Sequence, residues 1–214
     1  MSRNLKISLA LVAAAVVAVV VIANVGGDDT ATSDDVPRDD RLVRADSQRL
    51  SVADDGKVTF VEFLDFECEA CRAAHPAIEE LRETYDGRVT FVVRNMPLHG
   101  NSVAAAQAAE AAAAQDRFED MYDMLFETQP EWGEQDSSQE EVFFGFAEDL
   151  GLDMEEFRRV YDDPATIAKV ERDEADGRSL GVEGTPTFFL NGEKLDVSSF
   201  EELTNRIDDA LAAG

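Results

Sequence analysis

Two cysteines, Cys68 and Cys71, are the residues of this chain best suited to chemistry, and the 214-residue sequence contains no others. An apolar run over residues 58–63 precedes the pair, and a helical pattern over residues 68–85 follows it. A C-x-x-C pair where a strand passes into a helix is typical of redox chemistry. The free N–H groups and the dipole at a helix N-terminus favour a nearby anion. We therefore expect Cys68 to be the more thiolate-like cysteine, with Cys71 one turn deeper and within reach to close a disulfide.

Two other interpretations of the cysteine pair are weaker. A zinc site would need the two histidines, His75 and His99, and the resulting spacing C-x2-C-x3-H-x23-H is not a common finger spacing. A purely structural disulfide would close so short a loop that it would restrain the unfolded chain little. The sequence therefore favours a redox pair, gives no reason to expect a metal, and assigns no role to either histidine.

The composition describes an acidic protein of one domain, or of one domain with an insertion. The 46 acidic and 19 basic residues give a formal net charge of -27, and 44% of the residues are hydrophobic, which is enough to bury a core. No basic stripe is present, so nucleic acid and anionic membrane surfaces are not expected partners. Because this much like charge repels a second copy of the chain, we expect a monomer.

The N-terminus has the pattern of a membrane-targeting segment. Arg3 and Lys6 precede an uncharged run, whose part over residues 7–25 would be about 28 Å long as a helix, close to the hydrocarbon thickness of a bilayer. Acidic residues follow the run, which places the N-terminus inside and the rest of the chain outside. We expect residues 1–27 to form a single-pass signal-anchor in the cell membrane, or a signal peptide cleaved after Ala23. In both cases the main body is extracytoplasmic, where disulfide chemistry has a purpose.

Hydrophobic periodicity predicts an α/β domain. Residues 28–47 lack periodicity and are expected to form a flexible acidic stalk, and residues 48–214 are expected to form the domain. Strands are predicted at residues 49–52, 57–64, 89–94, 187–190 and 193–195, and helices at 68–85, 101–115, 117–127, 138–150, 153–161, 164–180 and from 198 onward. Roughly residues 100–180 thus form a helical insertion between an early β-α-β unit with parallel strands and a late β-hairpin with a final helix.

A second motif, Gly184-Thr185-Pro186-Thr187, stands directly before the first late strand. A C-x-x-C after a strand, followed much later by G-T-P-T-F-F-L-N-G, resembles the thioredoxin fold. With a helical insertion between the two motifs, the chain resembles the DsbA-like thiol:disulfide oxidoreductases over about residues 45–214. The resemblance implies an α/β thioredoxin fold, with a central mixed β-sheet flanked by helices and an α-helical insertion.

The resemblance also implies a role for each matching residue. Cys68 corresponds to the nucleophile that forms a mixed disulfide with a client, Cys71 to the resolving cysteine, and the Cys68–Cys71 disulfide to the redox-active centre. Pro186 corresponds to the family's cis-proline, and Thr185 before it would present backbone groups to an extended client peptide. Glu62 lies on the strand where the family has a buried acid. Burial would raise its pKa and let it take the proton from Cys71.

The chain departs from the family pattern between the cysteines. Many strongly oxidising members have Pro-His there, whereas this chain has Glu69-Ala70, and Glu67 adds a second carboxylate. Negative charge beside Cys68 disfavours its thiolate, and Arg72 offsets this in part. A less stabilised thiolate gives a more stable disulfide, so we expect these positions to make a weaker oxidant than the Pro-His members.

Together the two motifs predict an extracytoplasmic thiol:disulfide oxidoreductase that donates disulfides to exported client proteins with cysteine thiols. The resemblance implies reoxidation by a membrane redox partner, and no cofactor or metal is expected. Two alternatives stay open. The dithiol form would make the protein a reductase or isomerase, which Glu67 and Glu69 favour. If the cysteines are idle, the groove beside Pro186 would make it a peptide-binding chaperone.

Overall fold

The computed structural model describes residues 39–213, so the expected targeting segment and residues 28–38 of the expected stalk lie outside the described residues. Over the described residues the strands form one five-stranded sheet with the order β1-β3-β2-β4-β5. Its strands are β1 (Gln48–Ser51), β2 (Thr59–Leu64), β3 (Thr90–Asn95), β4 (Thr187–Leu190) and β5 (Glu193–Lys194). Strands β2 and β3 are parallel and the other neighbours are antiparallel, so the predicted mixed sheet is confirmed.

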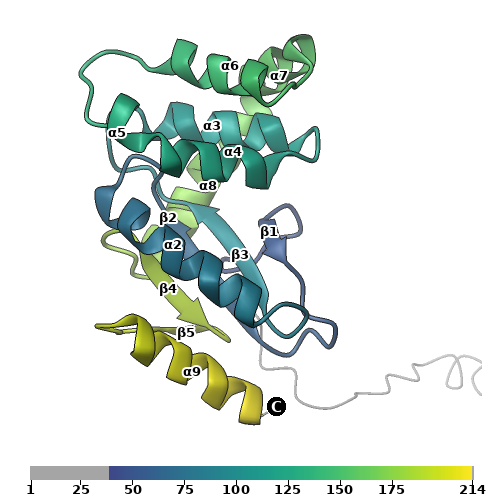
Figure 1. Cartoon of the computed structure of the whole chain (residues 1–214), viewed down its shortest axis with the longest axis vertical. Coiled ribbons are helices and arrows are strands. Elements are labelled where there is room, and N and C mark those ends of the chain that lie inside the picture. The colour runs from purple at the N-terminus through teal and green to yellow at the C-terminus, as the bar shows by residue number, and fades with distance from the viewer. Residues whose placement is uncertain (1–38, 214) are drawn as a thin grey trace, which may run out of the picture. The chain divides into compact units, whose positions relative to one another are not determined.

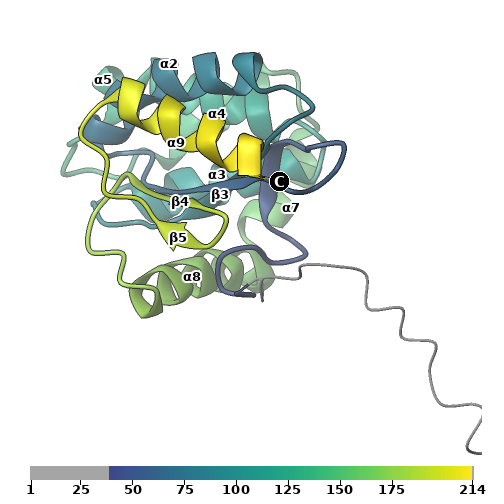
Figure 2. The same cartoon turned by 90° about the horizontal axis from the view of Figure 1, so that it is seen from below.

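Helices cover both faces of this sheet, as the predicted thioredoxin fold requires. Helix α2 (Glu69–Thr84) and helix α9 (Phe200–Ala213) lie on one face, and helix α8 (Pro164–Ser179) lies on the other (Figure 2). The predicted insertion is confirmed as a run of helices beyond one end of the sheet (Figure 1). Before α8 it contains α3 (Ser102–Ala113), α4 (Phe118–Glu127), α5 (Gln129–Trp132), α6 (Glu140–Asp149) and α7 (Met154–Tyr161). None of the helices described over residues 39–213 is long and apolar enough to span a membrane.

Strand β2 is the centre of the fold because apolar side chains leave it on both faces. Phe60 joins the core between the sheet and helices α2 and α9, together with Ile78. Val61 and Phe63 join the core on the opposite face. Alternate residues of a strand point to opposite faces, so an uninterrupted apolar run is what a strand buried on both faces needs. Because β2 and β3 are parallel, the loops that follow them leave the sheet at the same end, the carboxyl ends of both strands, and the cysteines lie at this end.

The alanine-rich helix α3 is the centre of the insertion. It packs against α4, α6, α7 and α8. Its fully buried alanines lie on several sides of the helix: Ala105, Ala106, Ala108, Ala109, Ala111 and Ala112. Side chains this small let neighbouring helices approach closely on every side, so an all-round apolar pattern here marks a buried helix.

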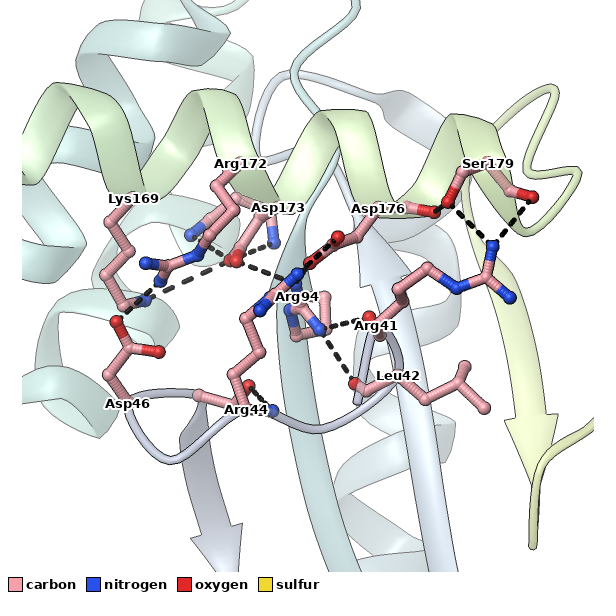
Figure 3. Close-up of polar contacts among 12 residues, drawn as sticks. Arg41, Leu42, Arg44, Asp46, Arg94, Lys169, Arg172, Asp173, Asp176 and Ser179 are labelled. Atoms are coloured by element: carbon pink, nitrogen blue, oxygen red, sulfur yellow. Dashed lines mark hydrogen bonds and ion pairs between the residues drawn. The ribbon is translucent and has the colours of Figure 1, made fainter. Parts of the chain in front are cut away.

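The expected stalk does not extend to residue 47. The structure packs residues 39–47 against α8, with Leu42 only 5% exposed. The guanidinium of Arg44 donates to both carboxylate oxygens of Asp176, at 2.5 and 2.7 Å (Figure 3). The acidic composition of the segment predicted flexibility, whereas the buried Leu42 and several polar contacts, among them the ion pair of Arg44 with Asp176, fix the segment on the domain.

Two local predictions are also corrected. The segment between the helices predicted over residues 117–127 and 138–150 contains the short helix α5, because Trp132 is fully buried and its Nε1 donates to the carbonyl of Leu125 at 3.2 Å. The helix predicted to begin at residue 138 begins at Glu140 as α6, and the Ser138 hydroxyl accepts from the Glu140 N–H at 3.3 Å. Neither change affects the end of the sheet at which the cysteines lie.

Candidate active site

Cys68 and Cys71 lie at the start of α2, as their spacing predicts. Cys68 is the N-cap residue of the helix, with an extended backbone (φ -72°, ψ 121°), and its N–H donates to the carbonyl of Asp65 at 3.1 Å. Cys68 is 9% exposed and Cys71 is 1% exposed, and both are free thiols. The first cysteine is thus the one that a client can reach, and the second is covered.

The second motif meets the first at Cys68. The Thr185–Pro186 peptide bond is cis, and the Cys68 Sγ lies 3.4 Å from the carbonyl oxygen of Thr185. Two motifs far apart in the chain are therefore brought together as the resemblance implies.

The surroundings of the two thiols separate their pKa values. Hydrogen bonding by the Cys71 side chain lowers the pKa of Cys68 to about 5; burial opposes this, while Thr185 and two backbone N–H groups of the first helical turn assist it. For Cys71, burial raises the pKa far above its ordinary value, and the Cys68 and Glu62 side chains raise it further. At neutral pH Cys68 is a thiolate and Cys71 is a thiol, the asymmetry that a nucleophile and a resolving cysteine need.

Glu62 is the buried acid of the site. It lies in the middle of β2, opposite Val93 of β3 and Phe188 of β4, and is 4% exposed. Burial raises the pKa of Glu62 to about 8, and the charges of Glu79 and Cys68 contribute. Because Glu62 also acts on the pKa of Cys71, it lies within electrostatic reach of both thiols. A carboxyl group that titrates near neutral pH is suited to proton exchange with Cys71.

We predict that Glu62→Gln slows the second step of exchange, in which Cys71 attacks a mixed disulfide on Cys68. Loss of a general base costs about 100-fold or more. In the wild type the rate of this step should rise with pH through about 8, the pKa of Glu62, and in the variant this rise should be absent. Stopped-flow measurement of glutathione release from Cys68 tests this. The matched control is the exposed Glu80→Gln, and equal rates for both variants would contradict a proton-transfer role.

Glu62→Gln should also change how the stability of the fold depends on pH. A buried carboxyl whose pKa is raised stabilises the fold below its ordinary value of 4.5 and loses that contribution as the pH rises through about 8. An amide has no such titration. The stability of Glu62→Gln relative to the wild type should therefore increase between these two pH values, independently of any effect on exchange.

Glu67, Glu69 and Ala70 are the three positions expected to make the protein a weaker oxidant, and Glu67 differs most from that expectation. Its carboxylate accepts from the N–H of Asn101 at 2.6 Å and from the hydroxyl of Ser102 at 3.4 Å, at the N-terminus of α3, and from the N–H of Glu134 at 3.0 Å. The charge expected to oppose Cys68 is thus compensated at a helix N-terminus. Glu69 and Ala70 are exposed, at the mouth of the site.

Gln129 of α5 is a site residue that sequence reasoning missed. Its side chain is buried, and its Nε2 donates to the carbonyls of Phe66 at 2.7 Å and of Cys68 at 3.0 Å. Its Oε1 accepts from Nε of Arg72 at 3.0 Å, so Arg72, expected to offset charge beside Cys68, is directed toward the insertion. The insertion thereby holds the backbone of the loop that carries Cys68.

Sequence reasoning did not single out Asp65, and it assigned no role to His99. The side chain of Asp65 is fully buried, and its Oδ2 accepts from the N–H of Leu98 and lies within hydrogen-bond distance of His99 Nδ1, both at 2.7 Å. Its Oδ1 accepts from the N–H of Glu67 at 2.9 Å. Both residues follow the carboxyl ends of the parallel strands β2 and β3. That position is the sequence signal from which they could have been found.

The zinc alternative is not formed in the described residues. The group there that could hold a metal ion consists of His75, Glu79 and Asp123, whose ligand atoms lie within 4.8 Å of one another, and it contains neither cysteine. His75 Nε2 contacts Asp123 at 3.0 Å, whereas His99 is held by Asp65.

Comparisons with known proteins agree with this geometry. The thioredoxin family model (Thioredoxin_4) matches residues 53–209. A thioredoxin-like oxidoreductase from Silicibacter pomeroyi superposes with a TM-score of 0.67 at 28% identity, covering 82% of this chain and 98% of that one. BdbD from Bacillus subtilis gives 0.68 at 26% identity, covering 76% and 91%. Alpha-DsbA1 from Wolbachia pipientis gives 0.71 at 20% identity, covering 80% and 94%, a likeness of fold alone.

The curated relatives are longer proteins. The chain is 39% identical over 142 residues to the Na(+)/H(+) antiporter NhaA of Herminiimonas arsenicoxydans, a match of 66% of this chain and 22% of that protein. It is 37% identical over 180 residues to NhaA 1 of Salinispora arenicola, a match of 81% and 26%. The chain thus spans about a quarter of the length of the curated relatives it matches.

Proposed function

This chain belongs to the thioredoxin family and is a DsbA-like oxidoreductase, and from that premise we propose that it exchanges disulfides with cysteine-containing client proteins through Cys68 and Cys71. The observation that carries the proposal is the contact of the Cys68 sulfur, at 3.4 Å, with the carbonyl before a cis-proline. The site also contains an accessible thiol of lowered pKa, Cys68, and a buried thiol of raised pKa, Cys71.

In the donor direction the reaction starts from the Cys68–Cys71 disulfide. A client thiolate attacks the Cys68 sulfur, the disulfide bond breaks, and Cys71 leaves with the electron pair and takes up a proton, which Glu62 can supply. A second client thiolate then attacks the client sulfur of the mixed disulfide, and Cys68 leaves as a thiolate. The client is oxidised by two electrons and the enzyme is reduced by two. No cofactor or metal enters these steps.

The backbone beside Pro186 is the proposed client-binding edge. Thr185 and Pro186 are partly exposed and directly precede β4, so an extended client peptide can align with this segment, strand to strand. Such pairing brings a client cysteine to Cys68 without a dedicated side-chain pocket, which suits an enzyme that accepts many sequences.

We place this chemistry outside the cytoplasm and in the donor direction. The apolar run at residues 7–25, with its basic flank, supports an extracytoplasmic domain anchored in the cell membrane and reoxidised by a membrane redox partner. The lowered pKa of Cys68 supports donation, because a stabilised thiolate favours the reduced enzyme and makes the disulfide a stronger oxidant. The antiporter activity named for the curated relatives is not carried over, since the match spans about a quarter of their length.

The reduction potential of the full-length protein tests both the activity and its direction. Equilibration with glutathione buffers should give a value nearer about −120 mV, that of a strong oxidant, than about −270 mV, that of thioredoxin. A value near thioredoxin's would assign the reductase alternative. Absence of any redox equilibrium with glutathione would overturn thiol–disulfide exchange and favour the chaperone alternative.

A further inference from the structure

The loop that leads into the cysteines and the loop that leads into α3 meet beside Cys68. Strands β2 and β3 run parallel in register, ending with Leu64 opposite Asn95. Asp65 directly follows β2, and His99 lies in the loop that follows β3. The segment between β3 and α3 is therefore one of the segments from which a side chain can act on Cys68.

Asp65 joins these two loops. Its fully buried carboxylate contacts His99 Nδ1 at 2.7 Å, and its backbone carbonyl accepts from the N–H of Cys68 at 3.1 Å. The His99 side chain is 47% exposed, and its own N–H donates to Ser102 at 3.1 Å. The imidazole is thus fixed on its Nδ1 side, while about half of the side chain remains exposed to solvent.

We propose that His99 is the cation of this active site, a positioning residue that, as an imidazolium held by Asp65, stabilises the thiolate of Cys68. The inference rests on the proposed function and deepens it. The residues between its cysteines, Glu69 and Ala70, carry no positive charge, so a cation that acts on Cys68 has to come from elsewhere in the fold. Arg72, the basic residue next along the chain, is directed toward Gln129.

The charges that face His99 favour its protonated form. They are Asp65, Cys68 and Glu67, all from the loop between β2 and α2, and all acidic. Burial lowers the pKa of His99, and these three groups, Asp65 foremost, raise it above its ordinary 6.5. Between about 5, the pKa of Cys68, and at least 6.5 the thiolate and the imidazolium are both present. Without the imidazolium, the buried carboxylate of Asp65 would keep only the N–H groups of Leu98 and Glu67 as partners, and its negative charge would oppose the ionisation of Cys68.

The first test leaves the sequence unchanged. Closing the Cys68–Cys71 disulfide removes the thiolate, so the pKa of His99, followed by proton NMR of its imidazole, should be higher in the reduced protein than in the oxidised one. By linkage, the part of this shift that the thiolate charge causes equals the effect of the imidazolium on the pKa of Cys68. His75, held by Asp123 at 3.0 Å in the same kind of pair, is the internal control and should shift less. Equal His99 pKa values in the two redox states would overturn the inference.

The second test is the variant His99→Gln, compared with the matched variant His75→Gln. Because the Cys71 pKa lies far above neutral, the ultraviolet thiolate absorbance of the reduced protein reports Cys68 alone in acidic solution. We expect His99→Gln to raise the pKa of Cys68 by about one unit, a tenfold change in its ionisation, and to shift the reduction potential toward a weaker oxidant. His75→Gln should leave both unchanged.

The outcomes separate this inference from the proposed function. An unchanged pKa of Cys68 in a folded His99→Gln protein would overturn the role of His99 while leaving exchange intact. The titration needs no client and no turnover, so it also gives an answer if exchange itself is not observed. Glutamine keeps an amide that can donate to Asp65, and circular dichroism confirms that the variant is folded.

Discussion

A Cys71→Ser variant is expected to accumulate a stable mixed disulfide on Cys68, and a Cys68→Ser variant is expected to lose exchange entirely. With its pKa lowered to about 5, Cys68 is about 99% thiolate at pH 7 and attacks a disulfide such as oxidised glutathione readily. The products are a Cys68–glutathione disulfide and one glutathione thiolate. In the wild type, Cys71 then attacks the Cys68 sulfur and releases the second glutathione. Serine cannot perform this step, so the adduct should persist.

The two variants should differ almost completely in their yield of glutathione adduct. Mass spectrometry of the full-length protein after brief exposure to oxidised glutathione should show about one adduct per chain for Cys71→Ser and none for Cys68→Ser. Serine is the replacement of choice at residue 71, because its hydroxyl can still donate to the Cys68 sulfur, the contact that lowers the Cys68 pKa most. Cys71→Ala lacks this donor and should form its adduct more slowly at acidic pH. Adducts on Cys71 in the Cys68→Ser protein would reverse the assigned roles.

The predictions that succeeded rest on local patterns. The helix start at Cys68, the strand before it and the turn at Asn191-Gly192 are each encoded within a few neighbouring residues. Positive φ angles at both turn residues, 49° and 92°, match the predicted hairpin turn. Burial of Glu62 was also predictable, because its neighbours along the strand are apolar.

What the sequence could not predict depends on contacts between distant segments. Gln129 reaches the carbonyl of Cys68 from the insertion, and nothing near residue 129 in the sequence indicates that contact. Glu67 was judged by its distance from Cys68 along the chain, whereas the direction of its carboxylate is decided by where α3 begins. The pattern of charges along the sequence does not reveal such partners. The effect of a carboxylate on the pKa of a thiol depends on their distance in the folded protein and on the groups that compensate the carboxylate's charge.

A second large effect is expected from Arg94, the buried cation that joins β3 to α8 and to the segment before β1. Its side chain is fully buried, and its guanidinium contacts Asp173 at 2.9 Å and Asp176 at 2.6 Å (Figure 3). It also donates to the carbonyl of Leu42 at 2.9 Å. Arg94→Met should lower the free energy of unfolding by about 3–5 kcal/mol, because it removes the guanidinium nearest to the buried carboxylate of Asp173 and one of the two that pair with Asp176.

Denaturant unfolding of Arg94→Met against Arg178→Ala measures this effect. Arg178 pairs with Glu174 on the surface of α8, and its loss should cost about 0.5 kcal/mol or less. Adding Asp173→Asn to Arg94→Met should restore part of the lost stability, since one uncompensated charge is then removed while Asp176 keeps Arg44. A cost for Arg94→Met as small as that for Arg178→Ala would contradict this.

The pH dependence of the protein's stability should test the same buried network independently. Burial opposes the charge of Asp176, but its hydrogen bonds to Arg44 and Arg94 outweigh burial and lower its pKa below the ordinary 3.8. A carboxyl group of lowered pKa stabilises the fold above that value and loses its contribution as the pH falls below it. Acid should therefore weaken the wild type more than an Asp176→Asn variant, whose amide does not titrate. Because this network fixes residues 39–47 on α8, acid should also release that segment first, which limited proteolysis would detect as cleavage before β1.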